Sequence, residues 1–355
     1  MDDEDFVTNP VSAKEIEDHG GDLDGATARF GEPAGGWVDL STGINPRAFP
    51  LPDIPSEAWA RLPLASDLAG LKEAAAAAYG AASTDMIACA PGTQAVIQML
   101  PRLIAADRVA VMGPTYSEHA AAWRAAGATV EDIGELPPPD RSLVLVNPNN
   151  PDGRMIAPER LAAWAVAAGK GGHTLVVDEA FADVSPEISL VPAFPLPNVI
   201  VLRSFGKFHG LAGLRLGFAV AMPDVVRRLE DELGPWAVSG PALTVGAQAL
   251  ADHGWAGHER TRLSADMDRL CDLLRGAGTN IIGRTDLFVL IECERAEALY
   301  DHLAKAGILV RRFQGFPKRL RFGLPGKAAH WARLEEALRT FDAVKGKERD
   351  RRRHG

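Results

Sequence analysis

The sequence predicts a two-part α/β protein: a larger domain with a mostly parallel sheet flanked by helices, and a smaller C-terminal α/β domain. Three observations support this prediction. Short, almost continuously apolar runs alternate with helix-like segments between residues 68 and 222, as expected of buried parallel strands joined by helices. After residue 222 the pattern changes to long amphipathic helices followed by short strands. At 355 residues, the chain is long enough for both domains.

Charge and composition argue against several functional classes and indicate how the chain is divided into segments. The net charge of −9 argues against nucleic-acid binding, which relies on basic surface. No apolar run is long enough to cross a membrane, and the acidic start is no signal peptide. Three scattered cysteines predict neither a disulfide framework nor a metal site, so we expect a cytoplasmic protein without a metal. The expected segments are an N-terminal arm that also joins the smaller domain (1–45), the larger domain (46–232), the smaller domain (233–345) and a mobile tail (346–355).

Two glycine-bearing turns come first along the chain. Gly20 and Gly21 follow His19, and a Gly-Ile-Asn45-Pro46 turn follows later. Exposed backbone amides in such turns suit a bound anion. An irregular arm that crosses the surface has the same composition, so both interpretations stay open.

The next candidate site is the turn that carries Gly92, Thr93 and Gln94. It lies between an apolar run at 86–90 and a helical segment that begins near residue 95. A helix N-terminus offers free amides and the positive end of the helix dipole to an anion. An ordinary turn with a capping threonine explains the same residues.

Regular alternation then continues through the larger domain. Ligands of such sheets bind at the carboxyl ends of the strands, so the polar residues that follow each strand are the candidates for function. The expected helices are 68–79, 95–100, 118–126 and 158–168, and the expected strands are 86–90, 108–112, 142–146, 174–177, 198–202 and 216–221.

Polar or aromatic side chains follow three of these strands. Tyr116 follows 108–112, where its ring could stack on a planar ligand. Asn150 belongs to an Asn-Pro-Asn-Asn-Pro-Asp-Gly run that follows 142–146. Asp178 ends an apolar strand, and a carboxylate in such surroundings needs a partner. A packed tyrosine, an ordinary turn and a structural cap are the alternatives.

One lysine segment carries the most specific signal. Lys207 lies among glycines and apolar residues, and burial lowers the pKa of a lysine enough to make its amine a nucleophile. Ser204 and Arg215 flank it, and a hydroxyl and a guanidinium both suit a phosphate. A loop with a solvated lysine is the alternative.

The smaller domain places arginines on or beside short strands. Arg311 and Arg321 stand in apolar surroundings, where an arginine is unusual unless it meets an anion. A solvated basic edge strand is the alternative. The expected helices are 223–233, 240–274, 296–306 and 328–341, and the expected strands are 287–291, 308–310 and 319–322.

From about residue 19 to about residue 341, this order of motifs resembles the fold-type I pyridoxal-phosphate enzymes of the class I/II aminotransferase family. In that family the lysine binds pyridoxal 5'-phosphate covalently, an asparagine contacts the ring oxygen and an aspartate pairs with the ring nitrogen. The resemblance implies cofactor-binding roles for Gly92, Thr93, Gln94, Tyr116, Asn150, Asp178, Ser204, Lys207 and Arg215, with Lys207, Asp178, Asn150 and Tyr116 also catalytic. Two positions depart from the family pattern. Asp152 stands where threonine is usual, and Phe181 lacks the hydroxyl of a tyrosine common there, which leaves more of the ring-oxygen contact to Asn150.

Within the family, runs that begin at His19, Trp37, Ser204 and Gly234 are most similar to the threonine-phosphate decarboxylase branch of cobalamin biosynthesis. That branch converts L-threonine O-3-phosphate to (R)-1-amino-2-propanol O-2-phosphate and CO₂. The likeness implies that Arg311 binds the substrate phosphate and Arg321 its carboxylate. The full set of implied substrate residues is His19, Gly20, Gly21, Asn45, Asn150, Arg311 and Arg321.

Three functions stay open at this stage: a decarboxylase, an aminotransferase of histidinol phosphate or another amino acid, and a non-catalytic binding protein. The first two differ only in which bond at Cα is held perpendicular to the cofactor ring, because that bond is the one that breaks. A small phosphorylated amino acid is the expected ligand. The resemblance also implies a homodimer.

Overall fold

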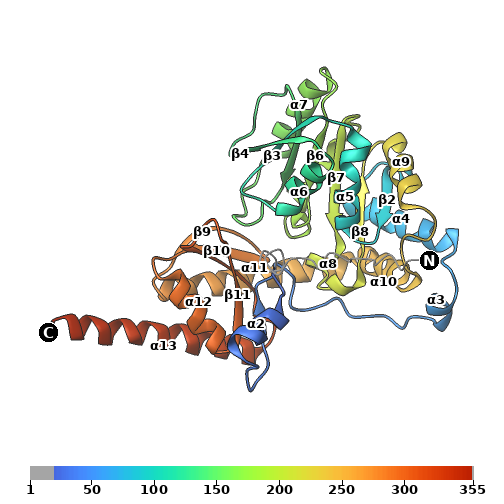
Figure 1. The fold of residues 1–355 in the computed structure, drawn as a ribbon. Coiled ribbons are helices and arrows are strands. Elements are labelled where there is room, and N and C mark those ends of the chain that lie inside the picture. The colour runs from blue at the N-terminus through green and yellow to red at the C-terminus, as the bar shows by residue number, and fades with distance from the viewer. Residues whose placement is uncertain (1–19, 354–355) are drawn as a thin grey trace, which may run out of the picture. The chain divides into compact units, whose positions relative to one another are not determined.

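A computed structural model describes residues 20–353, with side chains to residue 341 (Figure 1). The chain forms two compact units. The larger comprises Ile44–Arg269 and Ile282–Val289; the smaller comprises the residues up to Gly43, Leu270–Ile281 and the chain from Leu290 onward. His19, the start of the expected N-terminal arm and the end of the expected tail lie outside the described residues. The predicted domain bounds stay a prediction.

The larger unit contains a seven-stranded sheet in the order β2-β8-β7-β6-β5-β3-β4. Strands β7, β6, β5, β3 and β4 pair in parallel, whereas β8 is antiparallel to both of its neighbours. The mostly parallel sheet predicted from the sequence is therefore confirmed. The strands are β2 (Ile87–Ala90), β3 (Arg108–Met112), β4 (Thr129–Ile133), β5 (Ser142–Val146), β6 (Leu175–Asp178), β7 (Val199–Ser204) and β8 (Gly217–Val220).

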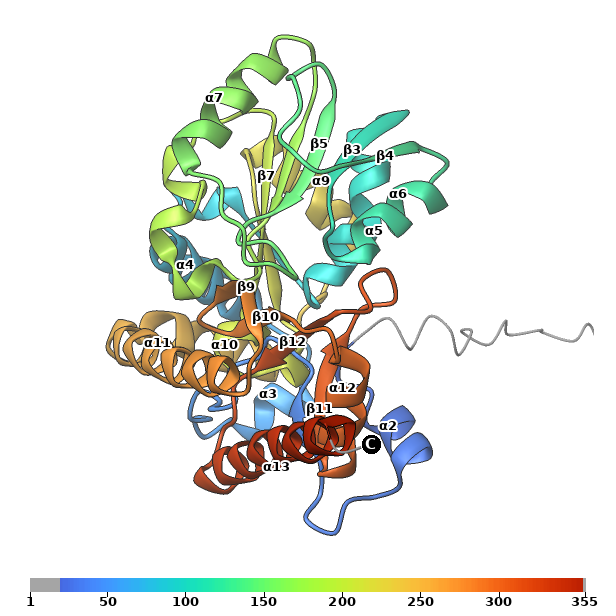
Figure 2. The same cartoon turned by 90° about the vertical axis from the view of Figure 1, so that its left-hand side faces the viewer.

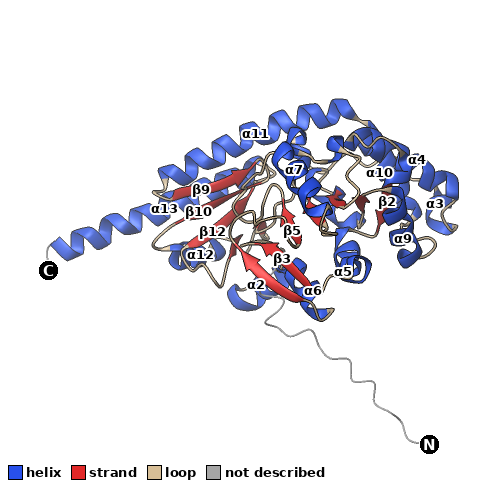
Figure 3. Ribbon diagram, turned by 90° about the horizontal axis from the view of Figure 1, so that it is seen from above, coloured by secondary structure: helices blue, strands red, loops and turns tan. Residues whose placement is uncertain are grey.

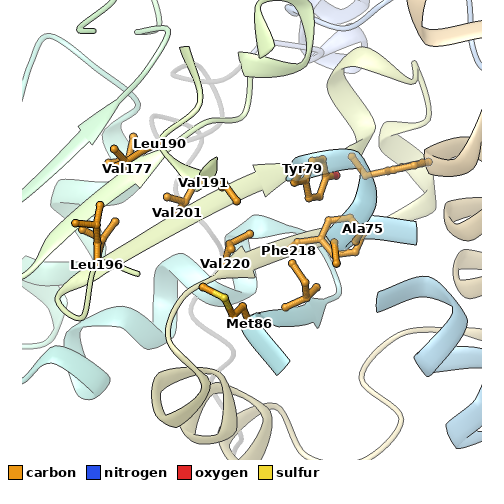
Figure 4. Close-up of a cluster of buried hydrophobic side chains, with 14 of the residues drawn as sticks. Ala75, Tyr79, Met86, Val177, Leu190, Val191, Leu196, Val201, Phe218 and Val220 are labelled. Atoms are coloured by element: carbon orange, nitrogen blue, oxygen red, sulfur yellow. The ribbon is translucent and has the colours of Figure 1, made fainter. Parts of the chain in front are cut away.

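Helices cover both faces of this sheet, with α4 and α7 on one side and α5, α6 and α9 on the other (Figure 2). Neighbouring strand residues point to opposite faces, so Val176 and Val177 belong to different apolar clusters. Figure 4 shows part of the cluster around Val177, in which Val201, Val220 and Tyr79 also lie. Burying one such aliphatic side chain stabilises the fold by roughly 1.5–3 kcal/mol.

The helices of the larger unit begin and end at residues with a local reason to do so. Pro223 opens α9, and Gly234 at φ 70° ends it. Gly80 at φ 74° ends α4 in the same manner. The helices are α3 (Ser56–Ala60), α4 (Ala65–Tyr79), α5 (Thr93–Ile104), α6 (Ser117–Ala125), α7 (Pro158–Gly169), α8 (Phe205–Phe208), α9 (Pro223–Leu233), α10 (Gly240–Ala251) and α11 (His253–Gly276). The end of α11, from Leu270, belongs to the smaller unit.

The single helix predicted over 240–274 is wrong in one respect, because two helices occupy this stretch. Asp252 leaves the helical conformation with ψ 75° and separates α10 from α11. Its side-chain Oδ1 accepts a hydrogen bond of 2.8 Å from the amide of Trp255. Aspartate favours this local capping bond over a place inside a helix.

The smaller unit is organised around a five-stranded sheet in the order β1-β11-β12-β10-β9. The strands of both sheets are red in Figure 3. Strand β1 was not predicted from the sequence, because three residues are too few to show a period, yet it pairs in parallel with β11. The elements of this sheet and its helices are β1 (Val38–Leu40), β9 (Asn280–Thr285), β10 (Phe288–Glu292), β11 (Ile308–Arg312), β12 (Arg319–Gly323), α2 (Leu23–Phe30), α12 (Ala296–Lys305) and α13 (Ala328–Arg353). None of the helices in residues 20–353 combines the length and apolar character that crossing a bilayer requires.

Candidate active site

The polar residues predicted for the larger unit gather at one edge of its sheet. Asp178 ends β6 and Ser204 ends β7, which run in parallel. Gly217 starts the antiparallel strand β8 and pairs with both Ser204 and Ala90. The loops that carry the other candidates therefore leave the sheet at the same edge.

The turn at Gly92 and the guanidinium of Arg215 form a close pair. A Cβ atom added to Gly92, whose φ is 86°, would lie 2.7 Å from Nη2 of Arg215. A Cβ added to Gly217 would lie 2.5 Å from the amide nitrogen of Thr93. Helix α5 begins at Thr93, so its first amides lie beside an arginine, and both glycines are needed for this close approach. This arrangement fits a phosphate group. Arg215 itself adopts φ 55°, a conformation rare for residues other than glycine.

Lys207 lies on the single-turn helix α8, directly after β7. Its Nζ atom is 5.8 Å from the ring centre of Phe181, and that ring packs edge-on against Phe288 at 5.0 Å. The phenylalanine that replaces the more usual tyrosine thus borders the lysine. It offers an apolar face and no hydroxyl.

Asp178 has a partner that the sequence did not reveal. His119 Nε2 lies 2.9 Å from Asp178 Oδ2, and both side chains are buried. The other carboxylate oxygen accepts a hydrogen bond of 2.9 Å from the amide of Ala180. This contact between His119 Nε2 and the carboxylate orients the Asp178 side chain. The sequence shows His119 only as a lone histidine three residues after Tyr116. Such a histidine is typical of a buried core as much as of a functional site, so it was not predicted.

A chain of contacts continues from this pair to the start of α5. The rings of His119 and Tyr116 meet edge-on at 6.0 Å. The Tyr116 hydroxyl donates to Gln94 Oε1 at 3.2 Å, and Gln94 Nε2 donates to Glu118 at 2.6 Å. Three predicted site residues, Asp178, Tyr116 and Gln94, are therefore connected through one that was not predicted.

Asn149 holds the loop that presents Asn150. The buried Asn149 side chain donates to Pro114 O at 2.9 Å and to Asp152 Oδ1 at 2.7 Å. It also accepts a hydrogen bond of 2.8 Å from Thr115 Oγ1. Asp152, where threonine is usual in the family, is therefore a structural partner of Asn149. The sequence motif predicted Asn150 as a site residue but did not reveal that Asn149 holds its loop in place.

A buried ion network lies immediately beside these strand ends. Arg203 precedes Ser204 and donates to Glu179, the residue after Asp178, at 2.8 Å. It also pairs with Asp183. Burial raises the pKa of Glu179 against the opposing effect of Arg203. Removing one member of such a network leaves an uncompensated buried charge.

Asn45, predicted to bind substrate, has its side-chain amide engaged within the larger unit. Its Nδ2 donates to Phe208 O and to Glu259 Oε1, both at 2.8 Å. Its Oδ1 accepts from the amide of Arg47 at 3.0 Å and from Arg262 Nη2 at 2.9 Å. An amide makes at most four such bonds in this arrangement, and all four are made.

The two arginines predicted in the smaller unit face each other across neighbouring strands. Arg311 of β11 and Arg321 of β12 are register partners. Arg321 is buried, and its Nη2 donates to the carbonyl of Ser41 at 2.8 Å. Burial, and then the charge of Arg311, lower the pKa of Arg321 to about 9, against the opposing effect of Asp39. The guanidinium group is the side-chain group whose geometry best matches a carboxylate or phosphate, so both arginines stay candidates for binding an anion.

The turn at Gly20 and Gly21 borders the same region of the smaller unit. The amide of Gly21 donates to Ser41 Oγ at 2.7 Å, and a Cβ on Gly20 would lie 2.4 Å from Ser41 O. A cavity of about 140 Å³ is lined by both glycines, Ser41 and Arg311. This exceeds the roughly 30 Å³ that one water occupies in the liquid, so a small anion has room. Two further arginines, Arg29 and Arg312, also line it.

Comparison with known proteins assigns this arrangement to a family. The profile of the family "Aminotransferase class I and II" matches residues 58–338. The chain belongs to this family. This membership confirms the resemblance drawn from the sequence motifs. It also implies the predicted cofactor, pyridoxal 5'-phosphate.

Two curated relatives named threonine-phosphate decarboxylase cover almost the whole chain. The one from Pseudomonas aeruginosa is 47% identical over 91% of this chain and 98% of its own length, and one from Sinorhizobium is 46% identical over the same shares. A histidinol-phosphate aminotransferase from Mycobacterium bovis is 32% identical over 72% of each chain.

Solved structures of two other enzymes share the fold. The histidinol-phosphate aminotransferase of Sinorhizobium meliloti, in complex with pyridoxal-5'-phosphate, superposes with a TM-score of 0.77 over 90% of this chain and 95% of its own at 21% identity. The L-threonine-O-3-phosphate decarboxylase of Porphyromonas gingivalis reaches 0.66 over 85% and 98% at 21% identity. These likenesses confirm the fold class predicted from the sequence.

Proposed function

We propose that this protein is a pyridoxal-phosphate carboxy-lyase that converts L-threonine O-3-phosphate to (R)-1-amino-2-propanol O-2-phosphate and CO₂. The observation that carries the proposal is the 47% identity to a threonine-phosphate decarboxylase over nearly the whole of both chains. The residues at the strand ends and the facing arginines support it. In this reaction the Cα–carboxylate bond breaks, and Cα takes up one proton.

The larger unit offers the groups that would hold the cofactor. The amides at the start of α5, beside Gly92 and Thr93, with Arg215 and Ser204, would bind its phosphate. Asp178, oriented by His119, would pair with the ring nitrogen, since a buried carboxylate favours a protonated partner. Lys207 would bind the aldehyde carbon, while Asn150, Tyr116 and Gln94 complete the set. When bound, the cofactor supplies an electron sink for the pair released at Cα.

The smaller unit offers the groups that would hold the substrate's anions. Arg321 is buried and its planar fork suits a carboxylate, whereas Arg311 lines the cavity beside Gly20 and Gly21 and suits a phosphate. His19 and Asn45 were also predicted to bind substrate, but His19 lies outside the described residues and the Asn45 amide already makes four hydrogen bonds in the larger unit. The facing arginines repel each other, so each anion that binds relieves a cost already present in the protein. Binding the distal phosphate would thereby help to turn the carboxylate to the orientation in which its bond to Cα breaks.

The remaining steps belong to residues of this chain. We propose that the Lys207 amine, once the substrate has replaced it on the cofactor, returns the proton to Cα. The apolar ring of Phe181 beside it would limit access of water to that amine. No position forbids transamination outright, because both reactions begin from the same bound substrate.

The deciding experiment incubates the purified, cofactor-loaded protein with L-threonine O-3-phosphate and identifies the products. We expect stoichiometric CO₂ and the amino-propanol phosphate, with no need for 2-oxoglutarate. Release of a 2-oxo acid without CO₂ would overturn the assignment. Lys207→Ala is the control, and it should lose both the activity and the yellow colour of the loaded protein.

A histidinol-phosphate aminotransferase is the second candidate. The 32% identity to such an enzyme from Mycobacterium bovis favours it, and a pair of facing arginines would suit a phosphorylated amine as well. Consumption of 2-oxoglutarate in the presence of histidinol phosphate distinguishes this activity from decarboxylation.

We also propose that the protein is a cytoplasmic homodimer. Large apolar side chains are exposed around α3 and in the turn before α10, where Gly240 abuts Ala58. Monomeric proteins seldom expose such groups side by side, so a second copy is the expected cover. The residues are Leu51, Trp59, Leu62, Leu64 and Trp236, with Trp59 68% and Trp236 59% exposed. Sedimentation of the wild type against Trp59→Glu tests the dimer.

A further inference from the structure

Lys207 lies on a helix too short to fix its own geometry. Helix α8 has only four residues, Phe205–Phe208. A single helical turn is not stable by itself, and the carbonyls at its end need partners from elsewhere. The orientation of the lysine therefore depends on groups outside the turn.

Several of those partners come from one short segment, residues 45–49. The carbonyl of Lys207 accepts from the amide of Asn45 at 2.9 Å, and the carbonyl of His209 accepts from the amide of Phe49 at 2.8 Å. Between them, the carbonyl of Phe208 accepts from the side-chain Nδ2 of Asn45 at 2.8 Å. Three successive carbonyls of the lysine turn are thus held by this segment, two of them by one asparagine.

Close packing leaves the two segments little freedom to slide. Gly210 adopts φ 67°, and a Cβ added there would lie 2.7 Å from Asn45 O and 2.8 Å from the Cα of Ala48. A side chain at this position would separate the segments. The glycine permits their contact.

Asn45 is itself held by an ion pair of helix α11. Its amide lies between Glu259 Oε1 at 2.8 Å and Arg262 Nη2 at 2.9 Å. Glu259 is almost fully buried, 3% exposed, and pairs with Arg262. Burial opposes the charge of Glu259, yet hydrogen bonds from Arg262 and Asn45 outweigh burial and lower its pKa. The carboxylate therefore stays charged and keeps its grip on the asparagine amide.

We propose that Asn45, clamped by Glu259 and Arg262, is a positioning residue that sets the orientation of the Lys207 turn. This inference rests on the proposed role of Lys207 as the residue that binds the cofactor. It differs from the sequence-based prediction that Asn45 contacts substrate, because every hydrogen-bonding atom of the amide already has a partner within the larger unit.

The test compares Asn45→Ala with a matched variant, Asn198→Ala. Asn198 is partly buried, and it donates from Nδ2 to two backbone carbonyls, Ala165 at 2.9 Å and His173 at 2.8 Å, but it lies before β7, at the opposite end of the parallel strands. Both variants should lose thermal stability. Only Asn45→Ala should change the orientation and surroundings of the Lys207 amine.

The decisive measurement is the pH titration of visible absorbance in the cofactor-loaded protein without substrate. We expect Asn45→Ala to shift its midpoint by at least about half a pH unit, because the surroundings of the lysine amine change. We expect kcat to fall about 10- to 100-fold with a smaller change in KM, as for a displaced catalytic group. Asn198→Ala should leave both quantities at the wild-type value.

Glu259→Gln is the second variant and covers the case in which Asn45→Ala does not fold. Glutamine keeps an acceptor for Asn45 but loses the charged pairing with Arg262. We therefore expect a smaller shift of the titration midpoint, in the same direction as that of Asn45→Ala where that variant folds. An unchanged midpoint in each loaded variant, or a change in KM alone, would overturn the proposal. The titration needs no substrate, so its result does not depend on whether threonine phosphate is the true substrate.

Discussion

The strand-end site of the larger unit and the arginine pair of the smaller unit differ in how their charges are balanced. Asp178 is buried but has His119 and a backbone amide as partners. Arg321 is equally buried, yet its register partner is a second arginine. In the first site the buried carboxylate already has two hydrogen-bond partners within the protein. At the second, burial and the charge of Arg311 lower the pKa of Arg321, while Asp39 opposes them and the Ser41 carbonyl accepts a hydrogen bond from the guanidinium.

Replacing Asp178 should have the largest effect of the changes that test this comparison. Asp178→Ala removes the carboxylate and leaves the buried His119 ring without its partner. We expect kcat to fall at least about 100-fold. Thermal unfolding should also show a loss of about 1–3 kcal/mol, because a buried polar group has lost its hydrogen bond. Stability equal to the wild type would contradict the internal balance described for this site.

Replacing Arg321 should separate function from stability in the opposite sense. Arg321→Met removes a buried charge and also the hydrogen bond to the Ser41 carbonyl, so we expect kcat/KM to fall about 100-fold while the thermal midpoint changes little. Inorganic phosphate offers an independent readout. It should raise the thermal midpoint of the wild type, since a ligand that binds only the folded state stabilises it. Arg311→Met is the matched variant for this readout, because Arg311 lines the cavity beside Gly20 and Gly21. If phosphate raised its midpoint as much as that of the wild type, this cavity would not be the phosphate site.

Replacing His119 should have a smaller effect on the same site as Asp178. His119→Ala removes the hydrogen bond that orients the carboxylate but leaves the carboxylate itself, so we expect kcat to fall about tenfold. His119→Gln can still donate a hydrogen bond and should recover part of the loss. Steady-state kinetics of both variants, compared with their thermal midpoints, separates orientation from general destabilisation.

The smallest expected effect concerns His209, which stacks between Phe205 at 4.2 Å and Trp255 at 5.5 Å. Burial lowers the pKa of His209 from 6.5, against the opposing effects of Asp183 and the Phe205 carbonyl. The unfolded chain then binds the proton more readily, so stability falls as the pH drops below about 6.5. The slope is at most about 1.4 kcal/mol per pH unit. His209→Phe should show a shallower loss of thermal midpoint between pH 7 and pH 5.5, and an equal slope would contradict the assignment.

The sequence was most informative where the chain repeats a simple physical pattern. Apolar strands such as 108–112 and 142–146 were predicted with the bounds that the structure has, because a strand buried on both faces must be apolar throughout. The residues at their carboxyl ends followed from the geometry of parallel sheets. Family motifs supplied the chemistry of Lys207 and Asp178.

It was least informative where a residue acts through a distant partner. His119 and Glu259 have no motif, because their roles depend on contacts with residues far away in the chain. The three-residue strand β1 owes its existence to pairing with β11, which no local pattern encodes. The break at Asp252 depended on one capping bond within an otherwise helical stretch.

The contact between Gly92 and Arg215 has a consequence for how the chain folds during its synthesis on the ribosome. One lies near the start of the larger unit's sheet and the other directly before β8, the strand inserted beside β2. On the ribosome, the proposed phosphate site is therefore incomplete until both stretches have emerged and paired.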